Sequence, residues 1–235
     1  MRRASAGLAR RIRASYAGRV EGAEGAPAPR RISIRTNGPY LVAGVPLLDA
    51  DGRTLETGST FELCRCGRSA TKPFCDETHD VIGFDGRETA DRGEVRDRRR
   101  AFEGAEITIY DVRRLCAHAA VCTDNLPKVF DVTRPRWIDP DAAPPGDLAD
   151  VVRRCPSGAL AYAMGENPEP VEPHLEPGIR CSRGASYVVT GGVELVGADG
   201  RPYERRERVT LCRCGASRNK PFCDGSHDDV DLADG

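Results

Sequence analysis

The chain carries one cysteine-rich stretch twice. Residues 63–79 read LCRCGRSATKPFCDETH and residues 211–227 read LCRCGASRNKPFCDGSH, and the two align without a gap, 148 positions apart. The similarity extends upstream, because residues 39–56 and 186–204 both alternate apolar positions and both turn, at DADG and at GADG. This pattern is typical of short strands joined by a hairpin. A repeat this small buries little core, so we expect metal to hold each copy.

The ten cysteines point to metal or redox chemistry. The N-terminus is rich in arginine and lacks the apolar run of a secretory signal, which argues against a disulfide framework. We therefore expect a cytoplasmic protein with a solvated basic tail. The alternative is a mitochondrial presequence and a matrix protein.

Composition excludes two classes of partner. The formal net charge is −1, so the chain has no overall basic field to favour nucleic acid. No apolar run approaches the roughly 18 residues of a membrane span. Aromatic residues make up only 6% of the chain, which favours several small modules over one large core.

Between the repeats lies a different unit. Residues 107–112 predict a strand, residues 144–155 a helix with Asp147 near its start, and residues 159–164 a closing strand. Charged or proline-rich segments flank this insert. The expected order is a basic tail (1–30), a first module (31–84), a linker (85–104), the insert (105–164), a linker (165–178) and a second module (179–235).

The repeated spacing C-x-C-x8-C-x3-H brings four ligand types together. On an extended segment, C-x-C points both thiols to one face, and C-x3-H shares one face of a helical turn. Three cysteines and a histidine are a common structural zinc set, so spacing alone permits zinc as well as iron. The candidate ligands are Cys64, Cys66, Cys75 and His79 in the first repeat, and Cys212, Cys214, Cys223 and His227 in the second.

The longer match, CRCGASRNKPFCDGSH, resembles the mitoNEET-like CDGSH iron–sulfur family. The resemblance covers both repeats, about half of the chain, and makes zinc the least favoured metal. It implies one [2Fe–2S] cluster per repeat on the eight residues above, and two β-rich modules paired as an intramolecular pseudo-dimer. It also implies groups that orient the ligands or tune the cluster: Ser69, Asp76, Ser217 and Asp224.

The first repeat departs from the family motif, since CDETH replaces CDGSH. Glu77 occupies a glycine position and adds a negative charge. We expect this charge to lower the reduction potential of the first cluster relative to the second. Any need for an unusual glycine conformation at this position is in doubt.

The insert resembles the divergent mono-cluster ferredoxins over residues 105–164. Bacterial ferredoxins use C-x2-C-x2-C and a remote C-P; here Cys116, Cys122 and Cys155 are kept, but Ala119 occupies the middle position. The resemblance implies a ferredoxin-like α+β fold and one [3Fe–4S] or [4Fe–4S] cluster on these three cysteines. His118 is a candidate fourth ligand, although a hydrogen bond to a cluster sulfur or a solvent-facing position is the simpler interpretation. Three structural cysteines without a cluster are the alternative for the whole insert.

The remaining features set the functional hypotheses. Cys181 has no counterpart in the first repeat and is interpreted as a buried, inert thiol. The sequence contains no nucleophile–base pair, phosphate loop or dinucleotide fingerprint, so we expect a carrier and not an enzyme. The first hypothesis is a monomeric multicentre electron carrier working with a redox partner. The alternatives are a protein that stores clusters or donates them to an apo-acceptor, with acid-labile histidine ligands, and a redox or iron sensor.

Overall fold

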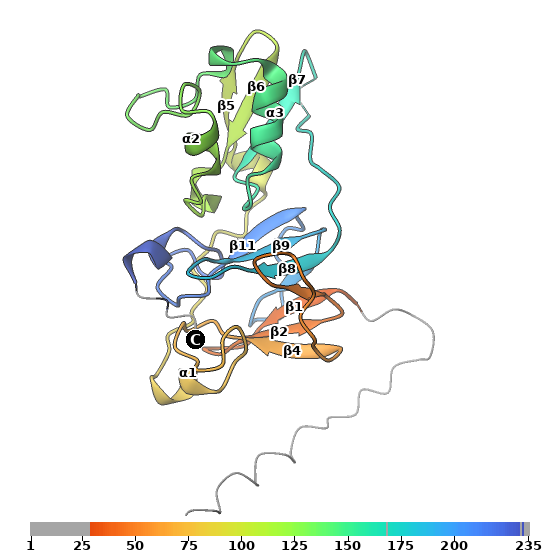
Figure 1. The fold of residues 1–235 in the computed structure, drawn as a ribbon, viewed down its shortest axis with the longest axis vertical. Coiled ribbons are helices and arrows are strands. Elements are labelled where there is room, and N and C mark those ends of the chain that lie inside the picture. Colours follow the sequence, from red (N-terminus) through yellow and green to blue (C-terminus); the bar gives the residue numbers. More distant parts are fainter. Residues whose placement is uncertain (1–28, 168, 231, 233–235) are drawn as a thin grey trace, which may run out of the picture.

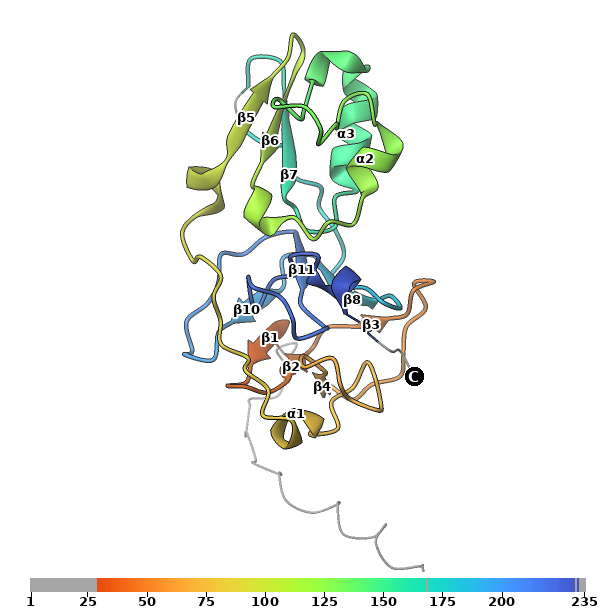
Figure 2. The ribbon, with the colours of Figure 1, turned by 90° about the vertical axis from the view of Figure 1, so that its left-hand side faces the viewer.

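The computed structural model describes residues 29–167, 169–230 and 232. Most of the predicted basic tail therefore lies outside the described residues. The described chain is an α+β structure in three tiers (Figures 1 and 2): the insert at the top, the second repeat (module 2) in the middle and the first repeat (module 1) at the bottom. The expected fold class, two β-rich modules plus an α+β insert, is confirmed. Within the described residues, no helix is both long enough and apolar enough to cross a membrane.

Each module places short strands before its ligand loop. Buried side chains alternate along them, with Ile32 and Ile34 on one strand and Tyr40 and Val42 on the next, because successive strand side chains point to opposite faces. Module 1 contains β1 (Arg31–Ile34), β2 (Tyr40–Ala43), β3 (Leu47–Leu48), β4 (Thr60–Leu63) and α1 (Thr78–Val81). Module 2 contains β8 (Gly178–Cys181), β9 (Tyr187–Thr190), β10 (Glu194–Val196), β11 (Arg208–Leu211) and the 3₁₀ helix η4 (Ser226–Asp229).

The two modules exchange a strand in each direction. One sheet has the order β10-β1-β2-β4 and the other β11-β9-β8-β3, so β10 of module 2 completes the sheet of module 1, and β3 of module 1 completes that of module 2. Both exchanged strands pair in parallel. The predicted hairpins at DADG and GADG form, with bridges between Leu48 and Thr54 and between Val196 and Pro202. Each hairpin reaches into the other module's sheet.

The insert is a three-stranded sheet covered by helices. The order is β5-β6-β7, and the predicted strand, helix and closing strand are confirmed as β6, α3 and β7. The helix α3 buries Leu148, Val151 and Val152, and Phe130 and Trp137 lie in the core. The elements are β5 (Arg100–Glu103), β6 (Ile107–Asp111), η2 (Arg113–Leu115), α2 (Val121–Asn125), η3 (Pro140–Ala142), α3 (Pro145–Arg153) and β7 (Leu160–Met164).

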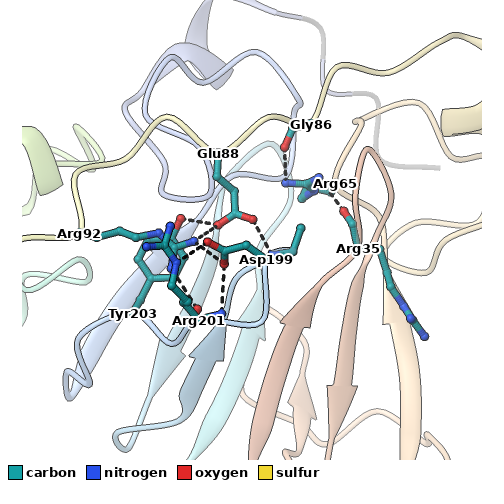
Figure 3. Close-up of polar contacts among 9 residues, drawn as sticks. Arg35, Arg65, Gly86, Glu88, Arg92, Asp199, Arg201 and Tyr203 are labelled. Carbon is teal, nitrogen blue, oxygen red and sulfur yellow. Dashed lines mark hydrogen bonds and ion pairs between the residues drawn. The ribbon is translucent and has the colours of Figure 1, made fainter.

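The segment 85–104, expected to be a linker, is fastened along much of its length. Its end forms β5 of the insert's sheet, after the 3₁₀ helix η1 (Val95–Arg98). Glu88 accepts a hydrogen bond from the backbone N–H of Ala198 at 2.7 Å and another from Arg92 at 2.9 Å, which Figure 3 shows. Arg92 in turn lies over the ring of Tyr203, 4.0 Å from its centroid. The run of charged residues suggested a linker, but these side chains find partners on module 2 that lie far away in the sequence.

The ligand loops of the two modules meet across a pseudo-two-fold axis. The hydroxyl of Tyr40 donates to the carbonyl oxygen of Cys212 at 2.9 Å, and that of Tyr187 donates to the carbonyl oxygen of Cys64 at 3.0 Å. The two rings pack edge to face, 6.2 Å apart. A methyl group at Gly67 would lie 2.5 Å from the carbonyl oxygen of Cys214. Each module therefore holds the other's loop in place.

This contact can be tested at Gly215, which has φ +80° and whose added methyl group would lie 2.7 Å from the carbonyl oxygen of Cys66. Gly200 is the matched control, because it has φ +78° and no heavy atom within 4 Å of that point. Gly200→Ala should cost about 1–2 kcal/mol of unfolding free energy, from backbone strain alone. Gly215→Ala should cost about 1–3 kcal/mol more, from overpacking. Denaturant unfolding of both variants measures the difference, and equal losses would contradict the inter-loop contact.

Candidate metal centres

The ends of β4 and β11 each present two thiols side by side. Cys64 and Cys66 follow β4, and their Sγ atoms are 3.7 Å apart. Cys212 and Cys214 follow β11, and their Sγ atoms are 3.8 Å apart. The predicted convergence of each C-x-C pair on one face is thus confirmed.

The third cysteine and the histidine form a second pair in each module. The Sγ atom of Cys75 is 3.4 Å from Nδ1 of His79, and the Sγ atom of Cys223 is 3.3 Å from Nδ1 of His227. The expected helical turn from cysteine to histidine is wrong in extent, since α1 begins at Thr78 and η4 at Ser226. In each module the cysteine and the histidine meet because the residue midway between them has a left-handed backbone conformation. The φ angle is 68° at Glu77 and 87° at Gly225.

These distances are compatible with metal coordination. Two thiolates bound tetrahedrally to one metal, with bonds of about 2.3 Å, lie roughly 3.8 Å apart. Each module offers one such Cys–Cys pair and one slightly shorter Cys–His pair. No group of three or more His, Cys, Asp or Glu side chains that could hold a single ion is found in the described part of the chain. The eight residues remain predicted ligands. We call the set in module 1 site 1 and that in module 2 site 2.

One thiol in each C-x-C pair has a lowered pKa. The hydrogen bond from Cys66 lowers the pKa of Cys64 to about 5, and that from Cys212 lowers the pKa of Cys214 to about 6. Burial raises the pKa of Cys223 to about 11. Since thiolate is the form that binds metal, a lowered pKa in each pair favours metal binding, and the remaining thiols lose their protons on binding.

The predicted supporting residues act on the backbone of the ligand loops. Ser69 donates to the carbonyl oxygen of Phe74 at 2.7 Å, and Asp76 accepts from the backbone N–H of Ala70 at 2.7 Å. Hydrogen bonds, first that from the side chain of Thr78, hold the pKa of Asp76 at about 2. Ser217 and Asp224 make the equivalent bonds to Phe222 and Arg218 at 2.7 and 2.8 Å. These four residues fix the path of the loop from the first thiol to the third.

Two residues were missed by the sequence analysis. Arg65 and Arg213, the middle residues of the two C-x-C pairs, are 1% and 3% exposed. Arg65 donates to the carbonyl oxygens of Arg35, Gly38 and Gly86 at 2.8–3.0 Å, two of which Figure 3 draws. These three hydrogen bonds tie the middle of the C-x-C segment to the surrounding backbone. The signal was available, because both repeats read CRC.

The three cysteines of the insert share one cavity. Cys116, Cys122 and Cys155 line it together with Ala119, the position that ferredoxins fill with a cysteine. Burial raises the pKa of Cys122 to about 11, and the backbone N–H of His118 points to Sγ of Cys116 at 3.4 Å. The structure thus brings the three predicted ligands together, and we call them the insert site. Their role as ligands remains a prediction.

His118 lies between the insert and module 2. It does not line the cysteine cavity. A methyl group at Gly225 would lie 3.0 Å from Cβ and Cδ2 of His118, so the histidine packs on the middle of the C-x3-H segment of site 2. The predicted fourth-ligand role of His118 is untested by this arrangement, which shows contact with module 2.

The same contact explains why the two motifs differ. Gly225 combines left-handed backbone with close packing against His118, so only glycine fits without movement. Glu77 adopts the same left-handed conformation, but its side chain is exposed. The doubt about a glycine conformation is therefore resolved: module 1 adopts it with a glutamate.

Cys181 differs from the prediction in its burial. It ends β8, is half-buried, and lies beside a cavity with Lys72, Pro73 and Arg213. The sequence analysis interpreted it as a buried, inert thiol because it has no counterpart in the first repeat.

Comparison with known proteins agrees with this division of the chain. The family model described as "Iron-binding zinc finger CDGSH type" matches residues 37–80 and 184–228. The model described as "Divergent 4Fe-4S mono-cluster" matches residues 102–165. The chain is also similar to the "Uncharacterized protein YjdI" of Escherichia coli, from strain K12 and from O157:H7. In both cases 35% of 63 residues are identical, covering 27% of this chain and 83% of the relative.

The insert site gives a direct test. Ala119→Cys places a thiol in the lining of the cysteine cavity and should complete a four-cysteine set, favouring [4Fe–4S]. If the native cluster is [3Fe–4S], the iron content should rise by about one atom per chain. Iron and sulfide analysis with low-temperature electron paramagnetic resonance measures the change. Ala101→Cys, on the exposed side of β5, is the control, and an unchanged Ala119→Cys spectrum would contradict a vacant corner at Ala119.

Proposed function

Because this iron–sulfur protein belongs to the CDGSH iron-binding family, with a divergent 4Fe-4S mono-cluster domain between its two CDGSH segments, we propose that it is a multicentre electron carrier. Its proposed centres are two three-Cys, one-His [2Fe–2S] clusters, at sites 1 and 2, and one [4Fe–4S] or [3Fe–4S] cluster at the insert site. When bound, these clusters supply reversible one-electron chemistry. The chain's own residues hold the clusters, fix their order and shield them from water.

The spatial order of the three sites supports this proposal. His118, two residues after Cys116, packs on Gly225, which lies between Cys223 and His227. On the far side of site 2, Cys214 meets Gly67, and Gly215 meets Cys66. The chain thus supports a linear sequence: insert site, site 2, site 1. Figure 1 shows the same sequence of tiers from top to bottom.

The ligand types give the sequence a direction. A neutral histidine in place of a thiolate removes a negative charge, which raises the reduction potential relative to an all-thiolate site. Electrons entering at the insert site would therefore move toward the two histidine sites. Glu77 adds a charge beside site 1 and lowers its potential relative to site 2, so site 2 is the acceptor of highest potential and the step from site 2 to site 1 is slightly uphill. We propose a carrier and not an enzyme, acting as a monomer in the cytoplasm with a redox partner.

The contact at Gly225 provides the test. Gly225→Glu copies the residue that module 1 has at position 77, so site 2 should keep its cluster while the new side chain displaces His118. Electron transfer from the insert site to site 2 should slow, because tunnelling falls steeply with distance. Freeze-quench electron paramagnetic resonance after reduction of the insert cluster measures the rate.

Glu77→Gly is the matched control for this variant. It should leave the transfer from insert site to site 2 unchanged and raise the potential of site 1. Equal rates in wild type and Gly225→Glu would count against the linear path.

One observation favours cluster donation as a second candidate function. The side chains of His79 and His227 are 12% and 11% exposed, so the histidine edge of each site reaches the surface. An imidazole releases metal when it is protonated, and free imidazole takes up a proton near pH 6.5. Such a site could release its cluster to an apo-acceptor or report iron status to a partner.

This candidate predicts faster loss of the [2Fe–2S] absorbance as the pH falls below about 6. His227→Cys should slow the loss at site 2, and His79→Cys should slow it at site 1, because a thiolate replaces the imidazole. His174→Ala, at an exposed histidine outside the three sites, should leave the decay unchanged. Visible absorbance at each pH gives the rates. Cysteine variants that bleach as fast as wild type would remove the mechanism for donation.

A further inference from the structure

A second cavity lies beside the insert site. Module 2 contacts the insert site through His118, which packs on Gly225, and through Arg208, which donates to the carbonyl oxygen of Cys155 at 3.1 Å. Asp111, Arg113 and Trp137 line the cysteine cavity and also the second cavity, which has a volume of about 370 Å³. One layer of side chains therefore separates this second cavity from the three cysteines.

The second cavity is strongly cationic. We call its charged lining the arginine face: Arg98, Arg100, Arg113 and Arg114. The carboxylate in this lining is Asp111, which is buried and 3.5 Å from Arg113. Asp91 lies 3.8 Å from Arg98, so the four arginines and these two aspartates give a formal charge of +2, although the whole chain carries −1. The positive charge is thus concentrated beside one redox centre.

The arginines are held in place by different elements. Arg98 lies on η1, Arg100 on β5 and Arg113 on η2. The guanidinium of Arg113 lies 3.9 Å from the centroid of Trp137, and Arg98 donates to the carbonyl oxygen of Gly93 at 2.8 Å. Arg100 and Arg114 are exposed. Charges presented by three separate elements form a broad rim, which matches a protein surface better than one small anion.

We propose that the arginine face is the docking surface for an acidic one-electron redox protein that exchanges electrons with the insert site. This proposal rests on the electron-carrier function proposed above. A positive patch of this kind raises the rate of encounter with a negative partner and orients it. In the transfer, the partner's reduced centre loses one electron and the oxidised insert cluster gains it, with no bond formed or broken.

The experiment uses a reduced acidic plant-type [2Fe–2S] ferredoxin as the probe. Stopped-flow absorbance follows its oxidation by the cluster-loaded protein at increasing sodium chloride. For wild type, the second-order rate constant should fall as salt rises, because screening removes the attraction. The double variant Arg100→Gln/Arg114→Gln should be slower by about 10-fold at low salt, within the range of electrostatic steering. It should approach wild type at high salt.

Two controls separate loss of the docking charges from other causes of a slower rate. Arg53→Gln/Arg87→Gln removes two arginines that are 75% and 83% exposed, away from the insert, and should keep the wild-type rate. Photoreduction with neutral 5-deazariboflavin should reduce all variants to the same extent. If wild type accepts no electrons even then, the carrier function itself fails, and the docking proposal fails with it.

Two results would overturn the docking proposal and leave the proposed carrier function standing. The first is a wild-type rate that does not depend on salt, or a double variant as fast as wild type, while deazariboflavin still reduces the clusters. The second is selective inhibition by inorganic phosphate at constant ionic strength, which would make the cavity a small-anion site.

Discussion

The arrangement of the whole molecule depends on the close approach of the two C-x-C loops. Gly67 and Gly215 let the backbones of Cys214 and Cys66 come near enough to exclude any side chain. Tyr40 and Tyr187 then fasten each loop from the opposite module with buried hydrogen bonds. Because both ligand loops are positioned by their partner, neither metal site is a property of one repeat alone. The proposed proximity of sites 1 and 2 follows from the backbone, before any metal is considered.

The insert turns this symmetric pair into a molecule with distinct ends. It packs on module 2 through His118 and through Arg208, whose guanidinium, 3% exposed, bonds to four carbonyl oxygens of the insert and to Glu172. Segment 85–104 reinforces the placement, since Glu88 and Arg92 bind module 2 on the way to the insert. At the equivalent position of module 1, Glu77 is exposed. Two nearly identical motifs therefore have different surroundings.

The sequence predicted what depends on local pattern. Periodicity located β6, α3 and β7, and the paired motifs located the thiols and histidines that the structure brings together. The strand exchange could not be predicted, because β3 has two residues and pairs with a strand more than a hundred positions away. The buried Arg65 was missed for a related reason, since its partners Arg35, Gly38 and Gly86 are backbone carbonyls supplied by the fold. The linker prediction failed at β5, where the charged residues Arg100 and Glu103 flank a single buried Phe102.

The exchanged strands also decide how the protein can be divided. If the repeats were produced separately, the sheet of module 1 would lose β10 and expose the edge of β1. That of module 2 would lose β3 and expose the edge of β8. Exposed edges of this kind recruit further strands. Each half would be driven to self-associate. Its own exchanged strand, the counterpart of the missing one, would be the nearest substitute. A single covalent chain thus serves here as protection against open-ended assembly.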